Sequence, residues 1–422
     1  METPNSSRWS ELPLDILRSL FERLSFVDFH RAKIVCTNWY LCSKQTLHKK
    51  RKSPWLMLFP EDGCVLYNPE EDRVYKTKRD LSKTRFLANS GNLFLTLDSK
   101  SNLYIIDLFS EKRINLPPLD SIKGLFTLKR IGDKEFDERL TSGDLGYSNR
   151  SVVDLRGLLW VDDKTEEYTV AWFFYSRVNY IAICKNGEDH YRTIPTGSID
   201  RKELQGLSDL VLRGDILYVY TIRRFIRILD LSRQEGFNGI VSNTGLLRPP
   251  SPPSSDDDTT SDGTISSHNI VVTTLGEVLL VESIVYEVTS AKPRISFRLY
   301  KEVPNPNPDK LIYRPNVYVK VDSIGDEALL LDLGITVPAD HTLGIEPNSI
   351  YFTRHDRVRN CKEKFSCRAR HICVFNLGTK NLTRFPNPQP LPLKAKGCSM
   401  VSPVLICLFL PLFHVMFSYL PM

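Results

Sequence analysis

The sequence predicts a mainly β protein in which a small module of three helices precedes a long region of short strands. Two observations carry this prediction: a compact helical pattern over residues 9–50 and strand-like runs from residue 55 onward. A chain of 422 residues is long enough for more than one core, and its 41% hydrophobic and 25% charged residues are typical of a globular protein. We therefore expect two folded domains.

The segment from Trp9 to Trp39 has the spacing of amphipathic helices. Pro13 suits a first helical turn, where its missing N–H would be unpaired in any case. Apolar residues then recur at intervals of three and four, and a second apolar set follows Ser25. These two sets are Ile16, Leu17, Leu20, Phe21 and Leu24, then Phe26, Phe29, Ile34, Val35 and Trp39. A module this small buries little surface, so we expect another protein to complete its core.

The strand region shows a loose repeat. Runs such as NLFLTLD, NLYIIDL, YTVAWFFY and DILYVY are short, rich in β-branched and aromatic residues, and separated by turn residues. A glycine opens an apolar run at intervals of about 50 to 65 residues, near the roughly 40–50 residues of one propeller blade with variable loops. The glycines are Gly91, Gly157, Gly214, Gly276 and Gly325. The pattern favours a β-propeller of short antiparallel four-stranded blades over residues 55–387, with a large β-sandwich as the alternative.

Residues 246–268 interrupt the strand pattern. This Pro/Ser/Asp tract has almost no apolar residue after Leu247 and cannot bury enough surface to offset the entropy of ordering. We expect it to be a disordered insertion between blades.

The apolar C-terminal tail, residues 398–422, is a second segment that does not follow the strand pattern. From Val401 to Leu420 it carries no charge over a length that spans a bilayer, and Lys394 and Lys396 precede it as in a tail anchor. Pro403, Pro411 and His414 within residues 401–420 argue against an anchor. Three alternatives stay open: a membrane anchor over 401–420, a packed final strand pair, or a stretch translated from a mis-assigned gene end.

The N-terminal pattern resembles the F-box motif. It has Leu-Pro at the start of the first helix, leucines along that helix, and Val-x-x-x-Trp from Val35 to Trp39. The later half, with SFRLYKEV, VKVDSIGDEALLLD, GIEPNSIYFT and ICVFNLGTKNLTRFP, resembles the plant F-box family that carries a KIB-type β-propeller. The resemblance covers residues 9–50 for the F-box and 55–387 for the propeller.

This resemblance implies a substrate-recognition subunit of an SCF-type cullin–RING E3 ubiquitin ligase. The F-box would bind the adaptor (SKP/ASK family) and through it the cullin, while the propeller would hold an unknown protein substrate for ubiquitination. The positions implied for adaptor contact, or for packing that shapes it, are Leu12, Pro13, Ile16, Leu17, Leu20, Leu24, Val35 and Trp39.

Other interpretations remain open at this point. The helical residues would also be explained by packing against the propeller. The propeller would also serve as a non-ligase interaction module that sequesters or inhibits a signalling protein, with or without a membrane tether. A membrane-tethered propeller enzyme is a third class of function and needs both the tail and an active site.

No sequence motif points to catalysis. Motifs for a phosphate-binding loop, a nucleophilic serine or a helix-borne zinc site are absent, and the eight histidines are scattered. We therefore expect a non-catalytic protein without a cofactor. The run CKEKFSCRARHIC supplies Cys361, Cys367, His371 and Cys373 but lacks the C-x2–4-C hook of most structural zinc sites, so no metal is predicted.

The same run belongs to a basic loop. Its arginines would suit an acidic or phosphorylated target, although a solvated loop is the more ordinary interpretation. The candidate target-binding residues are Arg357, Arg359, Arg368 and Arg370.

Charge and targeting signals limit the cell compartments in which the protein is expected. The net charge of +6 is spread along the chain and does not argue for nucleic-acid binding. No secretory signal is visible in the first thirty residues, and nine irregularly spaced cysteines form no disulfide framework. The run HKKRKSP (48–54) has the density of a nuclear import signal, or of a solvated helix end. We expect the nucleus, the cytoplasm or both.

Overall fold

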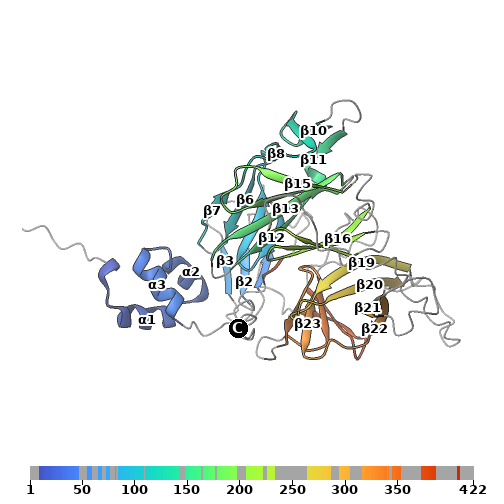
Figure 1. Cartoon of the computed structure of the whole chain (residues 1–422). Helices are drawn as coiled ribbons and strands as arrows, with labels where there is room; N and C mark the ends of the chain where they lie inside the picture. The colour runs from blue at the N-terminus through green and yellow to red at the C-terminus, as the bar shows by residue number, and fades with distance from the viewer. Residues whose placement is uncertain are drawn as a thin grey trace, which may run out of the picture.

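The computed structural model contains an N-terminal helical module beside a larger domain built from β-sheets (Figure 1). It describes residues 9–46, 55–58, 65–68, 73–76, 81, 84–108, 110–141, 148–162, 165–175, 178–196, 206–221, 226–232, 264–286, 294–304, 316–339, 341, 345–352, 372–385 and 406–408.

The helical module contains a short 3-10 helix η1 (Trp9–Glu11) and the helices α1 (Leu14–Arg23), α2 (Phe26–Ala32) and α3 (Thr37–Gln45). Pro13 is the N-cap of α1, and the Ser25 hydroxyl caps α2 by accepting from the Asp28 N–H at 3.2 Å. The core contains Leu17, Phe21, Ala32, Trp39 and Cys42. The predicted three-helix module is confirmed.

The described strands form six sheets. The first contains, in order, β28 (Ile406–Leu408), β1 (Trp55–Leu58), β2 (Val65–Asn68) and β3 (Arg73–Lys76). The second contains β4 (Arg85–Ser90), β5 (Leu93–Leu97), β6 (Leu103–Asp107) and β7 (Arg113–Asn115). The third contains β12 (Leu155–Val161), β13 (Tyr168–Phe174), β14 (Tyr180–Lys185), β15 (Tyr191–Pro195) and β8 (Ile122–Lys123).

Two sheets have three strands and one has nine. One small sheet contains β11 (Ser148–Ser151), β10 (Glu135–Leu140) and β9 (Phe126–Arg130), with the 3-10 turn η2 (Val152–Asp154) after β11. The other contains β16 (Leu207–Arg213), β17 (Ile216–Thr221) and β18 (Ile226–Asp230). The largest contains, in order, β22 (Asn316–Val321), β21 (Arg294–Pro304), β20 (Val278–Tyr286), β19 (Thr264–Val272), β24 (Ile335–Pro338), β23 (Glu327–Leu330), β25 (Ser349–Phe352), β26 (Ile372–Asn376) and β27 (Leu382–Phe385).

Runs of four antiparallel strands recur, as a propeller requires. They are β28-β1-β2-β3, β4–β7, β12–β15 and β19–β22. The nine-stranded sheet divides at its weakest link, because β19 and β24 are joined through the single pair Val272↔Ile335. The antiparallel propeller class is therefore confirmed, while the described residues of β9–β11 and β16–β18 form sheets of three strands where four were expected.

Hydrogen bonds join the first strands of neighbouring sheets side by side. Arg85 on β4 donates to the carbonyl of Leu155 on β12 at 2.7 Å. The fully buried Asp209 on β16 accepts from the Ile270 N–H on β19 at 2.7 Å. Radial repetition of this kind leaves sheets packed face to face around the domain, which buries residues such as Trp172 and Phe297.

The recurrent glycines are not equivalent positions of one repeat. Gly157 lies inside β12, where an added Cβ would come within 2.6 Å of the Leu95 Cδ2 atom, so glycine is needed for close packing against β5. The other four have φ between +57° and +83° with open space around them, which identifies turn positions. These are Gly91, Gly214, Gly276 and Gly325.

The predicted insertion 246–268 is wrong at its C-terminal end. Residues 264–268 belong to β19, where His268 lies 3.2 Å from the Glu282 carboxylate on β20. Strand pairing with β20 supplies the backbone partners that the composition alone did not reveal. Residues 246–263 lie outside the described part of the chain.

The tail is described only at β28, which pairs antiparallel with β1 through Leu56↔Cys407. For these three residues the pairing supports the packed-strand alternative. Among the described residues, none of the helices is long and apolar enough to cross a membrane. Anchoring by residues 401–420 stays an untested prediction.

Because it buries several tyrosines, the β domain should lose stability at alkaline pH. Burial raises the pKa of Tyr351 to about 12, and it raises the pKa values of Tyr191 and Tyr318 further. Because each folded pKa lies above the unfolded value near 10, the stabilisation is complete below pH 10 and is lost as the pH rises. For Tyr351 the loss is about 3 kcal/mol between pH 10 and 12. Urea unfolding of Tyr351→Phe should therefore show a smaller fall in stability from pH 9 to 12, and an unchanged fall would contradict this assignment.

Candidate functional site

Large apolar side chains remain exposed on the helical module. They come from η1, α1, the turn between α2 and α3, and α3 itself, and they make up nearly half of the exposed large apolar side chains in the described part of the chain. Clusters of exposed apolar groups on a small module indicate a surface for another protein. They are Trp9, Leu14, Ile16, Ile34, Val35 and Leu41, each between 50% and 59% exposed.

The geometry of α1 explains this exposure. Successive residues turn by about 100° in a helix, so Leu17 and Phe21 form one buried stripe. Leu14 and Ile16 lie on the two sides of that stripe, where no other helix of the module covers them. The other helices of the module therefore cover α1 only along the stripe of Leu17 and Phe21.

The sequence-predicted adaptor residues divide into three groups. Leu17 and Trp39 are buried, Leu12, Leu20 and Leu24 are partly buried against the core, and Pro13, Ile16 and Val35 are exposed. The exposed group offers the most surface to a partner. The buried and partly buried residues shape the module, as Trp39 does by donating its indole N–H to the Trp9 carbonyl at 2.9 Å.

Four exposed apolar residues were missed by the sequence reasoning: Trp9, Leu14, Ile34 and Leu41. Leu14 was detectable, because a helical wheel starting at Pro13 places it beside the apolar stripe. Ile34 was assigned to the second apolar set without a role in contact. Trp9 and Leu41 carry no sequence signal of exposure.

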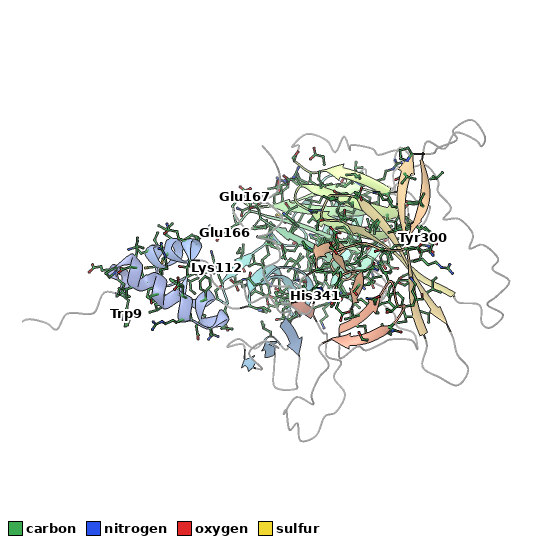
Figure 2. All side chains as sticks on the ribbon, turned by 90° about the horizontal axis from the view of Figure 1, so that it is seen from below. Trp9, Lys112, Glu166, Glu167, Tyr300 and His341 are labelled. Atoms are coloured by element: carbon green, nitrogen blue, oxygen red, sulfur yellow. The ribbon has the colours of Figure 1, made fainter. Side chains whose placement is uncertain are left out.

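A different face of α3 meets the β domain. The Tyr40 hydroxyl donates to the Glu166 carboxylate at 2.6 Å, and the Lys44 ammonium lies 4.8 Å from the centre of the Tyr40 ring. Figure 2 shows Glu166 and Glu167 on the side of the β domain nearest the helices, with Trp9 at the far end of the module. The exposed apolar residue Trp9 is thus turned away from this contact.

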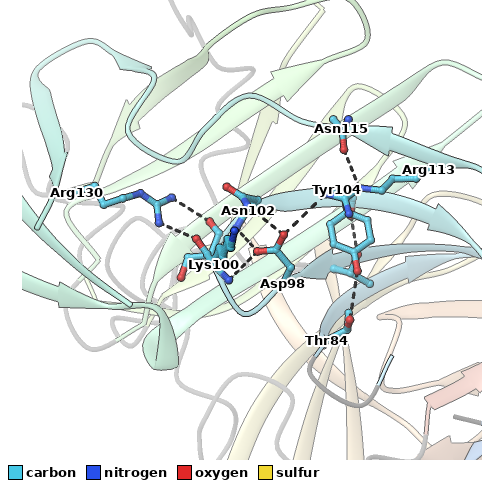
Figure 3. A network of polar contacts seen from close by, with 10 residues as sticks. Thr84, Asp98, Lys100, Asn102, Tyr104, Arg113, Asn115 and Arg130 are labelled. Atoms are coloured by element: carbon cyan, nitrogen blue, oxygen red, sulfur yellow. Dashed lines mark hydrogen bonds and ion pairs between the residues drawn. The ribbon is translucent and has the colours of Figure 1, made fainter. Parts of the chain in front are cut away.

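Within the β domain, a polar network ties the β5–β6 turn to neighbouring strands (Figure 3). The Asp98 carboxylate accepts from the backbone N–H groups of Lys100 and Asn102, both at 2.9 Å. Arg113 lies 3.9 Å from Asp98 and stacks 3.7 Å above the Tyr104 ring. Arg130 of β9 donates to the Lys100 carbonyl at 2.7 Å, which joins the small β9–β11 sheet to this turn.

A buried ion pair holds the same small sheet from its other side. Arg150 makes two hydrogen bonds to the Glu138 carboxylate, at 2.9 and 2.7 Å, and both side chains are 3% exposed. The Asn179 amide also donates to Glu138, and the Arg150 guanidinium faces the Phe174 ring. Both oxygens of the Glu138 carboxylate accept hydrogen bonds. The ion pair therefore joins β10 and β11 to Phe174 on β13 and to Asn179, which directly precedes β14.

The described part of the chain contains no cluster of side chains that would bind a metal ion. No three His, Cys, Asp or Glu side chains come together there in a way that would hold a metal ion. Burial raises the pKa of the Cys184 thiol to about 12, which keeps it protonated and unreactive at neutral pH.

The predicted basic loop lies outside the described part of the chain. Arg357, Arg359, Arg368 and Arg370 lie outside the described residues, as do Cys361, Cys367 and His371. Cys373 is described, on β26, and is partly buried.

Comparison with known proteins gives two family matches along the chain. Residues 9–50 match the F-box domain, and residues 66–376 match the KIB1-4 beta-propeller. The chain is 56% identical over 393 residues to F-box protein At5g25290 of Arabidopsis thaliana, covering 91% of this chain and 94% of that protein. It is 48% identical to F-box protein At2g14500 (85% and 98%) and 35% identical to F-box protein KIB4 (90% and 91%), both from the same plant.

Proposed function

Because the chain belongs to the family of F-box proteins that carry a KIB1-4 beta-propeller, we propose that it is the substrate-recognition subunit of an SCF-type ubiquitin ligase. The F-box binds an adaptor of the SKP family and, through it, the cullin. The propeller holds the protein that is to be ubiquitinated.

The observation that supports this most strongly is the open surface of the helical module. A folded core of Leu17, Phe21 and Trp39 coexists with exposed Ile16 and Val35, at 51% and 56%. The module needs none of the exposed side chains for its own core. A partner that covers them with an apolar groove gains the free energy of burying these side chains. It does not lose free energy to folding the module, because the module is already folded.

Ubiquitin transfer in this proposal is catalysed by partner proteins. The contribution of the chain is proximity, because a bound target has its lysines held at high local concentration near the charged ubiquitin carrier. Propellers present partners on loops gathered at one end of the domain, so we place the target there. The arginines 357, 359, 368 and 370 stay a proposed part of that surface.

The test is capture by the full chain and by a form that lacks residues 1–52. The full chain should co-purify with adaptor, cullin and a target identified by mass spectrometry. The shortened chain should lose adaptor and cullin, keep the target, and slow the target's degradation in cells because it occupies the target without delivering it. Loss of target capture by the shortened chain would contradict the assignment of the propeller as the substrate module.

The same experiment separates the alternative function. A non-ligase module that sequesters or inhibits a signalling protein would hold its partner in both forms, and neither form would contain adaptor or cullin. For localisation we propose the nucleus and cytoplasm, to be tested by imaging the full chain with and without residues 48–54.

A further inference from the structure

A contact between α3 and the β12–β13 turn joins the helical module to the β domain. Tyr40 on the F-box side donates its hydroxyl to Glu166 on the propeller side, and Lys44 of α3 lies over the Tyr40 ring. The 2.6 Å hydrogen bond crosses 126 residues of sequence. We call these three residues the interdomain latch.

On the F-box side, different faces of α3 contact the propeller, the core of the module and solvent. Tyr40 and Lys44 are four residues apart and therefore lie on one face of the helix. Trp39 and Cys42 point into the module core, and Leu41 is 50% exposed. Contact with the propeller therefore does not use the exposed apolar residues assigned to the adaptor.

On the propeller side, the turn that carries Glu166 is tightly held. The Glu166 N–H donates to the Asp162 carbonyl at 2.8 Å, and the Asp162 N–H donates to the Glu167 carbonyl at 2.9 Å. Glu166 has a φ of 60°, a left-handed conformation that residues other than glycine seldom adopt. The turn follows β12 and precedes β13, whose side chains are all buried, so it is anchored in the propeller core.

The positive charge of Lys44 supports the contact between Tyr40 and Glu166. The pKa of Lys44 is raised, first by its side-chain hydrogen bond with Tyr40 and also by attraction to the Tyr40 and Glu166 side chains. Lys44 therefore stays positively charged beside the Glu166 carboxylate. A cation over the ring of Tyr40 also favours the ring position in which the hydroxyl reaches Glu166.

We propose that the interdomain latch sets the orientation of the propeller relative to the F-box, and so decides which lysines of a bound target face the ubiquitin carrier. This inference rests on the proposed ligase function for its consequence, while the latch itself is a property of the chain alone. Tyr40, Lys44 and Glu166 are positioning residues in this account. The hydrogen bond from Tyr40 to Glu166 crosses between the domains, and one such bond to a carboxylate favours the closed arrangement over open ones by on the order of tenfold.

The first test measures orientation in the full chain without partners. Donor and acceptor dyes are attached to non-natural amino acids at Ser19 on α1 and Asn149 on β11, two exposed positions, and single-molecule energy transfer gives the distance distribution. Tyr40→Phe removes only the donor hydroxyl, and Glu166→Lys removes the acceptor and repels Lys44. Each should raise the open population by on the order of tenfold. The matched control Glu167→Lys makes the same charge change one residue away and should leave the distribution unchanged.

Two results would overturn the latch. One is an unaltered distance distribution in both Tyr40→Phe and Glu166→Lys. The other is an equal change in Glu167→Lys, which would show that the overall charge of the turn, and not the Tyr40 contact, holds the domains.

The second test separates positioning from stability and from adaptor binding. In a reconstituted ligase without target, Tyr40→Phe should keep the adaptor affinity and melting temperature of the parent. Mass spectrometry should show ubiquitin moved to different lysines of the propeller itself, because the same domain orientation decides which of its own lysines face the ubiquitin carrier. An identical lysine pattern would contradict a positioning role. Failure of the parent chain to bind the adaptor would overturn the proposed function, whereas the distance measurement on the isolated chain would still decide the latch.

Discussion

Replacing both Ile16 and Val35 by aspartate should lower the affinity for the adaptor by about a thousandfold while the protein stays folded. Each carboxylate would be forced into an apolar interface without a partner, at a cost of about 2 kcal/mol, and about 4 kcal/mol in total corresponds to three powers of ten in the dissociation constant. Both side chains are more than half exposed in the free chain, so the substitutions leave its own core intact. Adaptor titration by calorimetry measures the loss, and circular dichroism confirms the fold.

Arg18→Asp is the matched control for this experiment. It adds a carboxylate to the same helix, about 200° around from Ile16, on the charged side of α1. Its adaptor affinity should stay within a few-fold of the parent. Leu17→Asp is the opposite control, since Leu17 is fully buried and its replacement should unfold the module. Normal adaptor binding by the double variant at Ile16 and Val35 would refute the assignment of this surface.

Removing the Glu138 side chain should destabilise the propeller by about 3–5 kcal/mol. Glu138→Ala leaves the Arg150 guanidinium buried without a carboxylate, and an uncompensated buried charge is among the costliest single defects in a protein. The effect should be greatest on the β9–β11 sheet, which this ion pair fastens to β13 and β14. Urea unfolding gives the stability, and amide hydrogen exchange locates the loosened strands.

Two comparisons isolate the buried charge as the cause. Replacing both partners, as Glu138→Leu with Arg150→Met, should recover most of the stability because no charge is left unpaired. The exposed pair Glu277–Lys301, at 2.6 Å, serves as the surface equivalent, and Glu277→Ala should cost less than about 1 kcal/mol. Equal losses in Glu138→Ala and in the double replacement would show that packing, and not charge, is responsible.

Local patterns were sufficient for much of the fold. The helical spacing after Pro13 located α1, and runs such as DILYVY and YTVAWFF correspond to β17 and β13. These predictions succeed because the period of apolar residues reports which face of an element is buried. The same logic failed for residues 264–268, whose polar composition suggested a loop although they pair with β20.

Predicting the site was harder than predicting the elements. Eight residues were assigned from the motif either to adaptor contact or to packing that shapes it, and the structure places Leu17 and Trp39 in the core and Pro13, Ile16 and Val35 on the surface. A motif records which residues occur together and does not separate those that touch a partner from those that shape the module.

By itself, the sequence determined the order of elements, the mainly β class and the family of this protein, because each of these depends on short-range periodicity or on a motif within one segment. Only the tertiary structure decided that Trp39 is covered through its bond to the Trp9 carbonyl, that Glu138 meets Arg150 and Asn179 in the core, and that Tyr40 reaches Glu166. Each of these contacts depends on how far-apart segments pack. Burial and charge pairing are properties of that packing, and a single segment does not contain them.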